Sequence, residues 1–225
     1  MTASLDLSDE VRRGLAALPR IDTPSVRSLR RRYSKIMASE PAEIVLRFVR
    51  ALLDDASWAE RVVAWEILAA HERAFDRLND RLVEDMAHGL SDWGSVDLFG
   101  VTVVGRAWRA GLVTDAKILA WARSPDRWRR RLALVATVPL NSRARGGSGD
   151  ARNTLRVCRA LLGDSDDMVV KAMSWSLREL AKRDPKAVDA FLRKEEKRLS
   201  SRVIREVRNL LRTGTKSPPY RRFNV

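Results

Sequence analysis

The stretch Ser91–Asp97 contains two residues whose types and spacing could do chemistry, Trp93 and Asp97. They are four residues apart and therefore share one face of a helix. Ser91 or Asp92 can accept hydrogen bonds from the free N–H groups of a first turn, which predicts that a helix begins here. An unpaired carboxylate buried beside an indole is costly. Asp97 is therefore expected either to await a positively charged ligand or to pair with an arginine of a neighbouring helix, and spacing alone favours the arginine.

Helices are the only regular elements that the sequence predicts. Apolar residues recur at helical spacing along the chain, with no alternating strand pattern and no Asn-Gly hairpin dipeptide. Two helices are expected to begin at a cap followed by proline, from Thr23 through Ile36 and from Ser124 through Val135. The other predicted helices span about 9–18, 41–54, 58–71, 76–88, 92–110, 115–123, 151–162, 166–182, 185–199 and 201–212. The helix over 58–71 is expected to open with Ser57 and Glu60 at capping-box spacing.

Some of these helices repeat one pattern, in which an acidic or hydroxyl cap is followed four or five residues later by a basic residue. The basic residues recur at one or two units of about 34 to 40 residues, and they are Arg61, Arg131, Lys171 and Arg205. This period is typical of stacked helical pairs. The predicted fold is therefore an all-α, HEAT-like helical-repeat solenoid with a concave basic face. Each basic residue is expected to face a polyanion or, alternatively, to pair with an aspartate of the next repeat.

The repeat that contains Trp93 breaks this pattern. Val96 occupies the register of the basic residue, and Asp97 follows it. A single acid in an otherwise basic groove is predicted to be functional. By the same alignment Trp175 lies one turn after Lys171 and is also expected to face inward.

The charge balance indicates a polyanionic partner. Among 225 residues, 43 are Lys or Arg and 29 are Asp or Glu, which gives a net charge of +14. Nucleic acid is the first candidate and an anionic membrane the second. We expect one domain over 1–214 and a disordered basic tail over 215–225. The glycine-rich tract 141–150 is predicted to be a flexible loop in which Arg143 and Arg145 contact phosphate.

The inventory of metal-binding residue types is small. Cys158 is the only cysteine, and His71 and His88 fall in different predicted helices. We therefore expect no disulfide within the chain, no metal and no cofactor. No signal segment and no run of 18 apolar residues is found, so the protein is expected to be cytoplasmic, without membrane contact, and monomeric.

Three segments resemble a known family. Asp92–Asp97, Trp121–Arg131 and Lys171–Pro185 are similar to the AlkD-type DNA alkylation repair proteins, which are HEAT-like repeat DNA glycosylases, and the resemblance extends over about residues 20–212. It implies a lesion site formed by Trp93, Asp97, Arg131 and Trp175. It also implies that duplex DNA is the partner and that cationic N3- or N7-alkylated purines are excised without extrusion of the base. The basic residues of the repeat, Arg61 and Lys171, and those of the glycine-rich tract, Arg143 and Arg145, are then expected to contact this DNA.

This implied chemistry suits the available residues. A cationic alkylpurine leaves as a neutral base, so no general acid is required. An anion about 4 Å from the developing oxocarbenium ion, at an effective dielectric constant of about 20, contributes roughly 4 kcal/mol, or about a thousandfold in rate. Asp97 is assigned that charge, Trp93 and Trp175 are assigned π-face contacts with the cationic nucleotide, and Arg131 is assigned the adjacent phosphate.

The sequence departs from this family at its N-terminus. Family members have an additional first helix, and the helix after it carries a tyrosine that lies against the DNA; the corresponding position here is near Val11. The expectation is a variant subfamily with a shortened N-terminus, in which lesion recognition differs more than chemistry. Two alternatives remain open: a non-catalytic HEAT-repeat protein that binds branched or distorted DNA, and a protein-binding scaffold.

Overall fold

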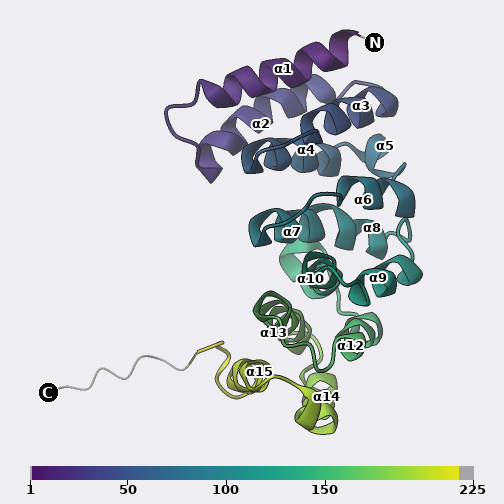
Figure 1. The fold of residues 1–225 in the computed structure, drawn as a ribbon, viewed down its shortest axis with the longest axis vertical. Helices are drawn as coiled ribbons and strands as arrows, with labels where there is room; N and C mark the ends of the chain where they lie inside the picture. The colour runs from purple at the N-terminus through teal and green to yellow at the C-terminus, as the bar shows by residue number, and fades with distance from the viewer. Residues whose placement is uncertain (1, 218–225) are drawn as a thin grey trace, which may run out of the picture. The chain divides into compact units, whose positions relative to one another are not determined.

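The computed structural model describes residues 2–217 and their side chains from residue 7 onward. All regular elements in this range are helices (Figure 1). They pack as repeated pairs, so the predicted all-α, helical-repeat class is confirmed. The chain divides into two compact units, Met1–Thr114 and Asp115–Val225. The predicted single domain over 1–214 stays a prediction.

The first unit contains nine helical segments. They are α1 (Thr2–Ala16), α2 (Thr23–Met37), α3 (Ala42–Leu53), α4 (Trp58–Ala70), α5 (Glu72–Phe75), α6 (Asp80–Met86), α7 (Trp93–Phe99), η1 (Gly100–Val104) and α8 (Gly105–Arg109). The second unit contains α9 (Asp115–Ala122), α10 (Arg127–Val135), α11 (Val138–Asn141), η2 (Arg143–Arg145), α12 (Ala151–Ala160), α13 (Asp167–Ala181), α14 (Pro185–Glu195), η3 (Glu196–Arg198) and α15 (Ser201–Thr213).

Local capping explains where several helices begin. Ser57 and Glu60 form the predicted capping box at the start of α4, in which each side chain satisfies the other residue's backbone N–H. Asp126 and Asp166 cap α10 and α13. The two caps predicted just before a proline are wrong: Asp22, and not Thr23, caps α2, and Asp126, and not Ser124, caps α10.

In the first unit, α4 lies parallel to the continuous helical segment formed by α7, η1 and α8. Arg61 bonds to Ser95, 34 residues later, and Arg106 bonds back to the carbonyl of Ala69 over a separation of 37 residues. Between these contacts the rings of Trp65 and Phe99 pack with centroids 4.9 Å apart. The contacts confirm a structural repeat of the predicted length.

In the second unit, α10, α13 and α15 form one row, and α9, α12 and α14 form the other (Figure 1). Polar contacts join α13 to the turn after α10 and to α15. Thr137 bonds to Ser176, 39 residues later, and Ser174 bonds to Glu206, 32 residues later. The same repeat therefore recurs in this unit.

Several predicted helices have other bounds in the structure. The helix expected over 76–88 is confined to α6, because the side chain of Asn79 accepts hydrogen bonds from the N–H groups of Arg81 and Leu82 and so starts the helix at Asp80. The helix expected over 9–18 begins earlier, at Thr2, and ends at Ala16.

The helix predicted over 92–110 contains a π-helical segment, η1, that begins three residues after Asp97. Here the N–H of Gly105 bonds to the carbonyl of Gly100, five residues back. Such segments insert an extra residue into a helix and are frequent at functional sites.

The glycine-rich tract is held in place, in contrast to the predicted flexible loop. Gly147 N–H bonds to Ser142 O at 2.9 Å, and Asp150 N–H bonds to the buried Asn141 side chain at 2.9 Å. A Cβ atom at Gly147 would lie 2.4 Å from the carbonyl oxygen of Pro139. Glycine is therefore required here for close backbone packing.

Of the predicted basic tail, residues 218–225 lie outside the described range, while 214–217 are exposed bends.

Candidate functional site

The N-terminus of α7 presents Trp93 and Asp97 on consecutive turns. The carboxylate of Asp92 accepts the N–H of Ser95 at 2.8 Å and fixes the first turn. Trp93 is the first residue of the helix, and 62% of its surface is exposed. Asp97 follows one turn later and is half-buried. The predicted shared helical face is thus present.

Arg61 ties α4 to this turn. One of its guanidinium N–H groups donates to the buried Ser95 hydroxyl at 2.9 Å and lies 3.4 Å from Asp92. Its side chain is 19% exposed. The sequence left two expectations for each basic residue of the repeat, a polyanion or an aspartate of the next repeat. Arg61 contacts such an aspartate, Asp92. Its role in DNA binding stays a prediction.

The second unit holds Arg131, Lys171 and Trp175. Arg131 is 6% exposed, and its Nη1 donates to Met168 O at 2.5 Å in the first turn of α13. Lys171 is exposed and pairs with Asp167 at 2.6 Å. That hydrogen bond lowers the pKa of Asp167. Trp175, one turn later on α13, is half-buried.

Arg143 and Arg145 lie on the exposed turn η2 of the glycine-rich tract. The anchored backbone around Gly147 fixes where this turn projects. Two guanidinium groups on an ordered exposed turn can each contact a phosphate.

A family model described as DNA alkylation repair enzyme matches residues 20–211. The chain belongs to the DNA alkylation repair enzyme family. The match includes the turn with Trp93 and Asp97, and it also includes Arg131 and Trp175. No curated protein matches the chain.

For this DNA alkylation repair family member, sequence analysis missed one exposed aromatic residue, Trp58. It is the first residue of α4 and is 36% exposed. Its Cδ1 and Nε1 atoms lie 3.8 and 3.9 Å from where a Cβ atom of Gly94 would stand. The signal was present in the sequence, because Ser57-Trp58 and Asp92-Trp93 have the same order of cap and tryptophan.

Val11, near which the resemblance to the family places a tyrosine, is fully buried. This residue packs into the core and offers no surface to a ligand.

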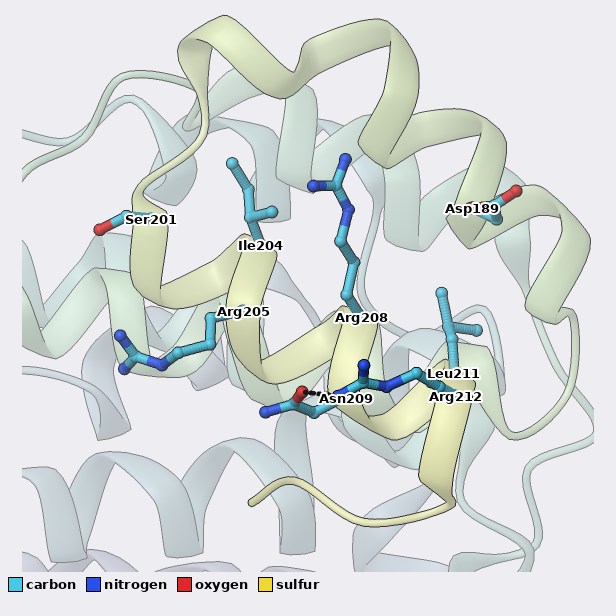
Figure 2. Close-up of a pocket in the computed structure, with 8 residues that line it drawn as sticks. All are labelled: Asp189, Ser201, Ile204, Arg205, Arg208, Asn209, Leu211 and Arg212. Carbon is cyan, nitrogen blue, oxygen red and sulfur yellow. Dashed lines mark hydrogen bonds between the residues drawn. The ribbon is translucent and has the colours of Figure 1, made fainter. Parts of the chain in front are cut away.

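The described chain also contains a groove in its second unit. Within the described residues, no group of His, Cys, Asp and Glu could hold a metal ion, and no helix is long and apolar enough to cross a membrane. A groove of about 730 Å³ lies between α14 and α15, where Ile204, Arg208 and Leu211 point toward α14 while Arg205 points away (Figure 2). Arg208 also pairs with Glu196 at 2.9 Å.

Proposed function

We propose that this family member is a DNA glycosylase that binds duplex DNA and hydrolyses the N-glycosidic bond of cationic N3- or N7-alkylated purines. The observation that carries the proposal is the pair on α7, an exposed indole one turn before a carboxylate, within the segment matched to DNA alkylation repair enzymes. A net charge of +14 suits a polyanionic substrate.

Asp97 acts as the electrostatic partner of the developing sugar cation. The bond between C1′ and the purine nitrogen breaks, and its electron pair stays with the purine, which leaves neutral. The carboxylate stabilises the oxocarbenium ion, water adds to C1′, and the water proton is released to solvent. No general acid takes part, because the leaving base already carries positive charge.

The remaining residues hold the substrate. Trp93 and Trp175 contact the cationic nucleotide through their π faces, each contributing about 0.5–2 kcal/mol. Phosphates are contacted by the exposed Lys171 and by the exposed parts of the Arg61 and Arg131 side chains. Arg143 and Arg145 add phosphate contacts from the ordered turn η2.

The test is release of 7-methylguanine and 3-methyladenine from methylated duplex DNA, measured by mass spectrometry under single turnover. Asp97→Asn should slow release by about a thousandfold, since it removes an attraction of roughly 4 kcal/mol. Its affinity for unmodified duplex should be unchanged or slightly higher. Equal rates for the variant and the wild type would remove Asp97 from the mechanism, and no release by the wild type would refute the glycosylase.

A second candidate, a non-catalytic protein for branched or distorted DNA, is favoured by two observations. Val11, near which the resemblance places the DNA-contacting tyrosine, is fully buried, and Arg131 bonds to Met168 O and is only 6% exposed. In that case the wild type binds a branched duplex more tightly than a linear one and releases no base. Asp97→Asn then alters neither property by more than a small factor.

A further inference from the structure

Two exposed indoles lie near each other on the first unit. Among the described residues, four large hydrophobic side chains are exposed: Ile21, Ile36, Trp58 and Trp93. Both tryptophans are the first residues of their helices, α4 and α7, which pack side by side (Figure 1). The Trp58 ring lies against Gly94, the residue after Trp93.

The relative position of the two indoles is fixed by contacts beneath them. Arg61, one turn after Trp58, bonds to Ser95 at 2.9 Å, and Trp65 packs on Phe99 with centroids 4.9 Å apart. Gly94 has no side chain to separate the Trp58 ring from the backbone of α7. The Cδ1–Nε1 edge of the Trp58 ring thus packs against Gly94, while 36% of the residue stays exposed.

We infer that Trp58 is a further DNA-contacting residue, which touches a nucleotide near the one held by Trp93. This inference rests on the proposed function for the location of the lesion, but not for the contact itself. Neighbouring packed helices are about 8–10 Å apart, and base pairs rise by about 3.4 Å. Trp58 therefore contacts the strand within about three base pairs of the lesion.

Nucleic acid is the occupant that the surroundings favour. An indole face packs on the deoxyribose of an intact duplex, so it adds affinity without sequence preference. The chain carries a net charge of +14, which attracts a polyanion to the protein as a whole. If a protein partner occupied this surface instead, Trp58→Ala would leave the Kd for DNA unchanged and position 58 would give no crosslink to DNA.

The test combines an affinity measurement with direct crosslinking. It uses the full chain and a duplex of about 20 base pairs. Trp58→Ala should raise the Kd for duplex DNA about 5- to 20-fold, and Trp58→Phe should restore most of the affinity. Ile36→Ala is the matched control, since Ile36 is 39% exposed on α2, and it should leave the Kd unchanged. Thermal melting identifies any loss caused by unfolding.

Crosslinking does not depend on the stability of an alanine variant. The photoreactive residue p-benzoylphenylalanine, introduced in place of Trp58, should crosslink to DNA, whereas the same residue in place of Ile36 should not. With an abasic-site analogue in the duplex, the crosslinks should map within about three base pairs of that site. Equal affinity of Trp58→Ala and the wild type, or no crosslink from position 58 in a protein that binds DNA, would overturn the inference. Failure of the glycosylase proposal appears separately, as no base release by the wild type.

Discussion

At the scale of single residues, two arginines of the repeat series, Arg61 and Arg131, form hydrogen bonds to the next helix of the array. The Arg61 guanidinium bonds to the buried Ser95 hydroxyl, and that of Arg131 bonds to Met168 O. The sequence predicted the spacing of these residues but could not identify Met168 O as a partner, because it lies 37 residues away. A repeated basic residue is therefore compatible with an internal brace as well as with a phosphate contact.

The Arg61 brace makes a prediction about stability. Arg61→Met should lower the free energy of unfolding by about 1–3 kcal/mol, because the Ser95 hydroxyl and Asp92 lose a hydrogen-bond partner. Urea denaturation at pH 7 measures this loss. Arg31→Met is the control, since Arg31 is exposed on α2 and loses the same charge. If both variants unfold alike, Arg61 does not brace the helices.

Cys158 provides a second prediction at this scale. Burial raises the pKa of its thiol to about 12, and the thiol lies 3.7 Å from the Ser176 hydroxyl. Because the folded state favours the neutral thiol, this contribution to stability is complete below the ordinary pKa of 9.0 and is lost as pH rises toward 12. At pH 8 a disulfide reagent should not react with the folded protein but should react at once in urea. Rapid reaction without denaturant would contradict the burial of this side chain.

At the scale of elements, local signals were predicted well and tertiary ones were not. The cap at Asp92 and the capping box at Ser57 depend on neighbouring residues, and the sequence located both. The π segment η1 and the break at Asn79 were missed, because helical periodicity alone does not distinguish one inserted residue or a new cap from a continuous helix. The exposure of Trp58 depends on packing against α7, which sequence does not show.

The glycine-rich tract makes a prediction about its own anchoring. Gly147→Ala should destabilise the protein by more than about 1 kcal/mol, because its Cβ atom would lie 2.4 Å from Pro139 O and the backbone would have to move. Gly163→Ala is the control. Gly163 has a positive φ but open space around it, so it should lose about 1 kcal/mol through backbone strain alone. Equal melting temperatures for the two variants would contradict the close packing at Gly147.

At the scale of the whole molecule, charge and family membership agree. The chain belongs to a DNA alkylation repair family over residues 20–211 and carries a net charge of +14. Trp93 and Asp97 belong to the first compact unit, and Arg131 and Trp175 belong to the second. The sequence predicted the fold class, but the roles of these residues stay predictions until the activity is measured.

The salt dependence of DNA affinity tests which charges contact phosphate. Each contact contributes about 0.9 to the slope of log K against log salt concentration. The double variant Arg143→Gln/Arg145→Gln should therefore reduce the magnitude of the slope by roughly 1 to 2. Arg193→Gln/Lys194→Gln removes two exposed charges from α14 instead and should leave the slope unchanged. The η2 turn has no role in binding if both double variants retain the wild-type slope.

The last helix among the described residues, α15, carries several arginines along one groove. Arg205, Arg208 and Arg212 line the groove beside α15, next to the half-buried Ile204 and Leu211 (Figure 2). Two copies that met through this surface would bring like charges together and would have to strip water from them. This surface of α15 therefore opposes the pairing of two copies through it, which would form a closed symmetric dimer.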